Sequence, residues 1–151
     1  MTATFQHDMR VLGVDLGGRR IGLAISDPEA SFAFPLAAIE SRGALRDVDA
    51  LHALIVERDV EHVVVGLPLH LDGRAGAGAD AAQRFADALR EAAGIPVDTL
   101  DERWTTREAE RALQSGGGSK KSRRAARKGG ERDSMAASIL LRTWLAREAS
   151  R

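Results

Sequence analysis

Two apolar runs near the N-terminus most constrain what this chain can fold into. Val11–Val14 and Ile21–Ser26 read as buried strands, and only the short segment DLGGRR separates them. This pattern predicts two strands joined by a hairpin-like turn, in which Gly17 and Gly18 can adopt positive φ. The first run ends at Asp15, so a carboxylate lies at the end of a strand that is expected to be buried.

The rest of the chain alternates between strand and helix patterns. We expect a third strand around Pro35–Glu40, an amphipathic helix over 44–59 and a strand at Val63–Val65. A helix over 80–93, a strand in VDTLDER and a helix from the capping box of Thr105 and Glu108 follow. A last helix is expected after Asp133. The first helix places Leu45, Val48, either Leu51 or His52, and Ile55 at helical spacing, and the last one packs Met135, Ile139, Leu140 and Trp144. Gly66 and Pro68 are expected to shape the turn after the fourth strand. This order predicts an α/β fold, a mixed sheet with helices on its faces.

Length and composition limit the number and the class of domains. With 151 residues and 44% hydrophobic content, the chain can bury one core. We expect a tail at 1–8, a single domain at 9–149 and a mobile basic loop at about 115–130. The sequence has no membrane-length apolar run and no signal peptide, which predicts a cytoplasmic protein. The chain has no cysteine, so any metal must be bound by oxygen or imidazole.

Charge is unevenly distributed along a chain whose 22 basic and 22 acidic residues cancel. The first two thirds are acidic, whereas the part from Glu102 onward is strongly basic. Nucleic-acid phosphates are the expected partners of the loop cations Lys120, Lys121, Arg123, Arg124, Arg127 and Lys128, and of Arg19, Arg20 and Arg103. A solvated basic face is the alternative interpretation.

Acidic residues follow or precede the predicted elements at positions that suit metal binding. Asp15 ends the first strand, Asp101 and Glu102 end the fifth, and Asp133 precedes the last helix. If the first and fifth strands are parallel, these acids meet at one edge of the sheet. Such a cluster suits Mg²⁺ or Mn²⁺, and two such ions can hydrolyse a phosphodiester. Each acid also has an ordinary alternative: a turn residue, a helix cap or a solvated side chain.

Several motifs in this order resemble one known family. GVDLGGRRIGLAISD, VVVGLPLHLDG, LDERWTTREAERAL, a basic loop and RDSMAASILL together resemble the YqgF/RuvX-type family of pre-16S rRNA nucleases and Holliday junction resolvase-like proteins, over Met9–Leu145. The resemblance implies an RNase H-like fold with a five-stranded sheet whose first three strands are antiparallel. It also implies a metal-dependent nuclease site formed by Asp15, Glu102 and Asp133, with Glu102 chosen over Asp101.

The resemblance and the residues together lead to one preferred function. We expect a nuclease that depends on Mg²⁺ or Mn²⁺, with two such ions in one site, and that matures the 5′ end of pre-16S rRNA. The alternatives are a Holliday junction resolvase-like DNA endonuclease, a non-catalytic RNA-binding assembly factor, and an actin-like or sugar-kinase ATPase. RNA or branched DNA is the expected partner, with no membrane, and the chain is a monomer or a homodimer.

Overall fold

The protein folds around a single mixed sheet. The computed structural model describes residues 9–68, 76–102 and 130–150. The strands are β1 (Arg10–Leu16), β2 (Arg20–Ser26), β3 (Ala33–Glu40), β4 (Val60–Leu67) and β5 (Val97–Asp101), in the order β3-β2-β1-β4-β5. β1, β2 and β3 pair antiparallel, whereas β4 is parallel to both β1 and β5. The predicted mixed sheet with three antiparallel strands at its start is confirmed.

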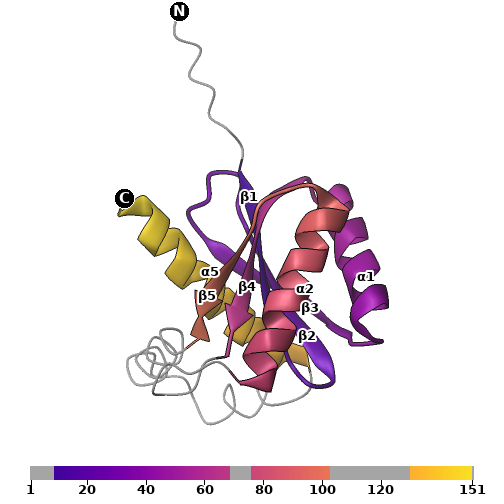
Figure 1. Ribbon diagram of the computed structural model, residues 1–151. Helices are drawn as coiled ribbons and strands as arrows, with labels where there is room; N and C mark the ends of the chain where they lie inside the picture. The colour runs from indigo at the N-terminus through magenta and orange to yellow at the C-terminus, as the bar shows by residue number, and fades with distance from the viewer. Residues whose placement is uncertain (1–8, 69–75, 103–129, 151) are drawn as a thin grey trace, which may run out of the picture.

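Helices cover both faces of this sheet, as Figure 1 shows. α1 (Ala44–Glu57) and α2 (Ala77–Ala93) lie on one face, and the long α5 (Gly130–Ala149) crosses the other. In β1, Leu12 and Val14 pack with the α1 and α2 side, whereas Val11 packs with α5. Because the middle of β1 is buried on both faces, the stretch Val11–Val14 is continuously apolar rather than alternating.

A glycine in β1 allows α5 to approach the sheet closely. A Cβ built on Gly13 would lie 2.9 Å from Cβ of Leu141 and 3.0 Å from the carbonyl oxygen of Ala137. Both distances are shorter than normal van der Waals contact, so any side chain at this position would push the helix away. Gly13 therefore fixes how near the backbone of α5 lies to β1.

The start of α1 depends on a buried carboxylate. Asp47 accepts hydrogen bonds from the Ser41 hydroxyl at 2.6 Å and from the Arg42 amide at 2.8 Å. Its own side chain is buried, and the cap residue Gly43 offers no side-chain hydrogen bond to the helix. Asp47 thus holds the connection between β3 and α1 against the first turn of the helix.

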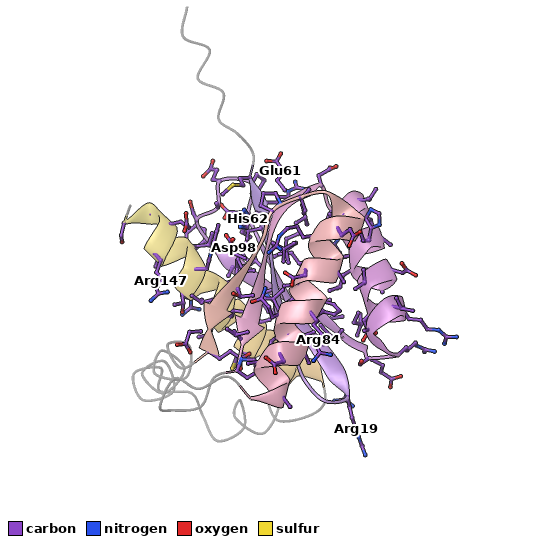
Figure 2. The ribbon with its side chains drawn as sticks, viewed as in Figure 1. Arg19, Glu61, His62, Arg84, Asp98 and Arg147 are labelled. Carbon is purple, nitrogen blue, oxygen red and sulfur yellow. The ribbon has the colours of Figure 1, made fainter. Side chains whose placement is uncertain are left out.

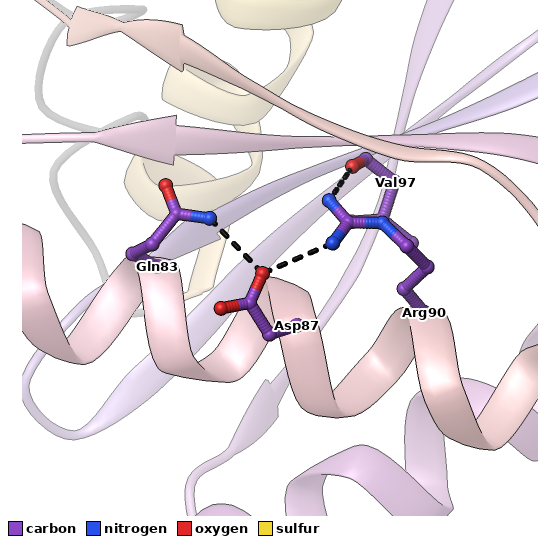
Figure 3. Close-up of polar contacts among 4 residues, drawn as sticks. All are labelled: Gln83, Asp87, Arg90 and Val97. Carbon is purple, nitrogen blue, oxygen red and sulfur yellow. Dashed lines mark hydrogen bonds and ion pairs between the residues drawn. The ribbon is translucent and has the colours of Figure 1, made fainter.

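The connection between α2 and β5 is also held by side chains, which Figure 3 shows in detail. α2 ends at Gly94 in the left-handed conformation, with φ of 68°. Arg90 donates to the carbonyl oxygen of Val97 at 2.5 Å and to the Asp87 carboxylate at 3.0 Å, and Gln83 donates to the same carboxylate. These contacts attach the beginning of β5 to the last turns of α2.

Two residues that helical spacing predicts to be in the core are exposed instead. In both cases a nearby polar side chain is buried in their place. Leu45 is 85% exposed, because the buried stripe of α1 includes Asp47 and leaves Leu45 outside it. Met135 is 45% exposed, because Ser134 faces the sheet instead and donates its hydroxyl to the carbonyl oxygen of Leu36. The packing of Trp144 into the core is confirmed.

Element boundaries and the hairpin turn also differ from expectation. β4 runs over Val60–Leu67, longer than predicted, and α5 begins at Gly130 rather than after Asp133. Neither Gly17 nor Gly18 adopts the positive φ that the turn pattern allows. Within the described ranges, the glycines with positive φ are Gly43 and Gly94. The predicted tail at 1–8, the helix from Thr105 and nearly all of the loop at 115–130 lie outside the described residues. No helix in the described part of the chain is long and apolar enough to span a membrane.

Candidate nuclease site

The carboxyl ends of three parallel strands bring two of the predicted acids to one edge of the sheet. Val14 of β1 is paired with Val65 of β4, and Leu67 at the end of β4 is paired with Asp101 at the end of β5. Asp15 therefore lies beside the end of β4, and Glu102 follows β5 directly. The expected parallel arrangement of the first and fifth strands is present, with β4 between them.

Asp15 and Glu102 are joined by a hydrogen bond between their carboxyl groups. Burial of Glu102, this hydrogen bond, and the negative charges of Asp15 and Asp101 raise the pKa of Glu102 from 4.5 to about 8. Two carboxylates in contact cannot both stay ionised without a counter-charge, so Glu102 keeps its proton at neutral pH. A cation held between them would replace that proton.

Gly66 of β4 lies directly beneath the carboxyl group of Glu102. A Cβ at this position would collide with Oε1 of Glu102 and would lie 3.1 Å from both Cδ and Cγ. The sequence pattern predicts that this glycine shapes the turn after the strand, yet it lies within β4 and its φ is not positive. The pattern GLP alone does not reveal this contact, because it depends on a residue at the end of another strand.

The third predicted acid, Asp133, lies in the first turn of α5. Its side chain is outside the described set, so the contact of Asp133 with Asp15 and Glu102 stays a prediction. The next residue, Ser134, is tied to the carbonyl oxygen of Leu36 in β3, which fixes the backbone of this turn against the sheet. Among the described side chains alone, no group of three acids or histidines is close enough to bind a metal.

Arginines surround the hairpin at the same end of the sheet. Arg19 is exposed at the turn, where Figure 2 shows it projecting away from the sheet, and Arg20 is half-buried. The carbonyl oxygen of Arg19 accepts a hydrogen bond from the Ser41 amide at 2.9 Å, so Arg42 lies close by. Arg103 and the loop cations from Lys120 to Lys128 fall outside the described residues.

Sequence reasoning missed two cations in this region, Arg42 and Arg46. Both are exposed, and no ion pair in the described part of the chain reaches them or Arg19 and Arg20. We call Arg19, Arg20, Arg42 and Arg46 the arginine corner. A usable clue is their clustering within the otherwise acidic first two thirds of the sequence.

A second polar cluster lies toward the opposite end of the sheet, as Figure 2 shows. Nε2 of His62 is 2.7 Å from the Asp98 carboxylate, and the imidazole ring packs against Trp144 at 4.7 Å between centroids. The side chain of His62 is only 15% exposed. This cluster attaches α5 to β4 and β5 and belongs to the packing of the fold.

Solved structures with the same architecture identify the fold. The chain aligns with RuvC of T. thermophilus, solved in complex with a Holliday junction substrate, with a TM-score of 0.61, 19% identity, and coverage of 94% of this chain and 97% of that one. A Fowlpox virus resolvase, solved with Holliday junction DNA, aligns with a TM-score of 0.55, 12% identity, and coverage of 93% and 99%. The sheet topology and these likenesses define an RNase H-like fold.

Sequence comparisons assign the family. Residues 9–147 match the RuvX family, described as Holliday junction resolvase. A relative from Anaeromyxobacter sp. (strain Fw109-5), named "Putative pre-16S rRNA nuclease", is 42% identical over 137 residues, which cover 91% of this chain and 96% of the relative. A relative of the same name from Chloroflexus aurantiacus is 41% identical over 139 residues, covering 92% and 88%.

The chain therefore belongs to the RuvX family, and it is an enzyme of the class that hydrolyses phosphodiester bonds. The predicted family, fold and enzyme class are confirmed. The family assignment also rules against the ATPase alternative. The roles of individual site residues are not tested by these comparisons and remain predictions.

Proposed function

We propose that this protein is a divalent-metal-dependent nuclease whose ions are bound by Asp15, Glu102 and Asp133. The observation that supports this most strongly is the hydrogen-bonded pair of Asp15 and Glu102 at the carboxyl edge of the sheet. The proton that Glu102 retains offsets one of the two negative charges of the pair, so a cation that takes its place would be held by both carboxylates.

The donor set fits Mg²⁺ or Mn²⁺. Both are hard cations that prefer carboxylate oxygens, and the chain has no cysteine to select a softer metal. Bound divalent ions, two in the preferred arrangement, supply an activated water and stabilise the leaving oxygen. The protein's own part is to fix Asp15 on β1 and Glu102 after β5, so that their oxygens point to one place.

Phosphate binding is assigned to the basic side chains around this edge. The arginine corner offers guanidinium groups without ion-pair partners among the described residues, at the same end of the sheet as Asp15. Arg103 and the loop cations Lys120, Lys121, Arg123, Arg124, Arg127 and Lys128 are proposed to extend this surface. Such contacts position a nucleic-acid backbone without reading its sequence.

We propose the 5′ end of pre-16S rRNA as the substrate, which places the enzyme in ribosome biogenesis in the cytoplasm. The name shared by relatives at 42% and 41% identity supports this choice. The family description supports a branched-DNA resolvase as the second candidate. The two differ in substrate geometry, because a resolvase must make paired incisions and so requires two active sites, as in a dimer.

The test is a cleavage panel with single-stranded RNA, a pre-16S-like RNA, single-stranded DNA and a four-way junction. Each is incubated with Mg²⁺ or Mn²⁺, and with EDTA as the control. We expect metal-dependent cleavage of the pre-16S-like RNA, and its loss in Asp15→Asn with folding unchanged. Preferred paired cleavage of the junction would favour the resolvase. Binding of RNA without cleavage of any substrate would favour the assembly factor.

A further inference from the structure

The contact between Glu102 and Asp15 spans an intervening strand. β4 lies between β1 and β5, and neighbouring strands are about 4.8 Å apart, so the two acids start from strands separated by roughly twice that distance. Glu102 must therefore reach across β4 to meet Asp15. The residue at the crossing is Gly66, which is paired with Leu100 of β5.

The crossing is possible because Gly66 has no side chain. Its nearest neighbours in the direction of a Cβ are Oε1, Cδ and Cγ of Glu102, so the carboxyl group occupies the place that a side chain would take. We propose that Gly66 is a positioning residue of the nuclease site: it leaves the gap through which Glu102 reaches Asp15. This inference rests on the proposed function, because its consequence for catalysis requires that Glu102 binds metal.

Among the described residues, no other feature of the surroundings of Gly66 requires a glycine. Gly66 does not adopt positive φ, and it lies inside a strand after three consecutive valines, Val63–Val65. A glycine within a strand is disfavoured, and it often marks a close approach of another group. Fold stability alone would therefore favour a side chain at this position.

Gly13 provides a matched comparison on the neighbouring strand. It also has no room for a Cβ, but the obstruction there is Cβ of Leu141 and the backbone of Ala137 in α5. Only a shift of the helix can relieve that clash. At Gly66 the obstruction is the far end of one flexible side chain, which can rotate away. Replacement by alanine is thus expected to disturb the packing of α5 at Gly13, and to displace the Glu102 carboxyl group at Gly66.

The first experiment compares Gly66→Ala with Gly13→Ala. In a crystal structure of metal-free Gly66→Ala, we expect the Glu102 carboxyl group to have moved away from Asp15. Its melting temperature should stay within about 3 °C of wild type, whereas Gly13→Ala should lower it by about 5 °C or more, because overpacking against α5 is costly. A Gly66→Ala chain that fails to fold, or one with Glu102 unmoved, would overturn the inference.

The second experiment measures Mn²⁺ affinity by calorimetry, alongside kcat and KM for RNA. Displacing Glu102 should weaken Mn²⁺ binding by roughly ten- to hundredfold and lower kcat, with KM nearly unchanged. Adding Glu102→Gln to Gly66→Ala should cost little more than either change alone, because both remove the same ligand. Fully additive losses, or wild-type affinity in Gly66→Ala, would contradict the positioning role. If the wild-type protein itself binds no Mn²⁺ and cleaves nothing, the proposed function fails, and the crystal structure still decides where Glu102 lies.

Discussion

Glu102 hydrogen-bonds Asp15 from two strands away, across β4. This contact joins acids that are far apart in the sequence, and it concentrates negative charge at the carboxyl edge of the sheet. It also makes the metal-free site sensitive to pH, since one of the two carboxyl groups is protonated where ordinary carboxylates are not.

The first prediction concerns the stability of the metal-free protein. The pKa of Glu102 rises from 4.5 to about 8 on folding, so the folded state binds this proton more tightly than the unfolded state. The resulting stabilisation is complete below pH 4.5 and is lost as pH rises toward 8. Urea unfolding in EDTA should therefore show a free energy of unfolding that falls between about pH 5 and pH 8.

Glu102→Gln is the control for this pH dependence. It removes the titrating group but keeps the length of the side chain, so most of the fall in stability across that range should disappear. An equally steep fall in the Gln variant would assign the effect to other groups.

The second prediction concerns the buried carboxylate at the start of α1. Asp47→Ala removes the acceptor for the Ser41 hydroxyl and the Arg42 amide, and should lower the free energy of unfolding by about 1–3 kcal/mol. Denaturant unfolding of Asp49→Ala, an exposed acid of the same helix, is the comparison. Equal effects of the two changes would mean that the Asp47 contacts contribute nothing specific.

The third prediction concerns the arginine corner. Arg42→Gln with Arg46→Gln should weaken binding of RNA to a similar degree whatever its sequence, and should reduce the slope of log affinity against log salt by about one for each phosphate that the variant no longer neutralises. Arg58→Gln removes an exposed charge just beyond the opposite end of α1 and should change neither quantity. Fluorescence anisotropy at several salt concentrations measures both. A weakening confined to one RNA sequence would argue against backbone binding.

The fourth prediction concerns Asp133. If it binds metal with Asp15 and Glu102, Asp133→Asn should reduce cleavage by more than the roughly hundredfold typical of groups one step removed from a metal. The circular dichroism spectrum and melting temperature should not change. Glu131→Gln, two residues earlier in α5, is the matched control and should retain activity. Full activity in Asp133→Asn would exclude it from the site.

Much of the fold follows from local patterns in the sequence. The apolar runs at Val11–Val14 and Ile21–Ser26 predict the β1–β2 hairpin, and the helix and strand patterns that follow predict the later elements of the described chain. The errors arise where a polar side chain competes for the interior. Asp47 takes the place in α1 that periodicity gives to Leu45, and Ser134 faces the sheet in place of Met135.

The site is less accessible to sequence reasoning than the fold. Asp15 and Glu102 can be named from strand ends and from family resemblance, but their contact depends on the order of the strands. The role of Gly66 requires knowing that β4 lies between β1 and β5, and that Glu102 crosses it. Arg42 can be added to the proposed phosphate-binding surface because the Ser41 amide donates a hydrogen bond to the carbonyl oxygen of Arg19, which brings the end of β3 beside the hairpin turn.

The most direct test of the central claim is a Mn²⁺ titration of the wild-type protein, Asp15→Asn and Glu102→Gln by calorimetry, with cleavage of a pre-16S-like RNA measured on the same samples. The proposed site predicts that the wild-type protein binds Mn²⁺ and cleaves the RNA, and that each substitution abolishes cleavage and weakens Mn²⁺ binding by at least about tenfold while the protein remains folded. Wild-type Mn²⁺ affinity and cleavage in both variants would show that Asp15 and Glu102 do not form the metal site.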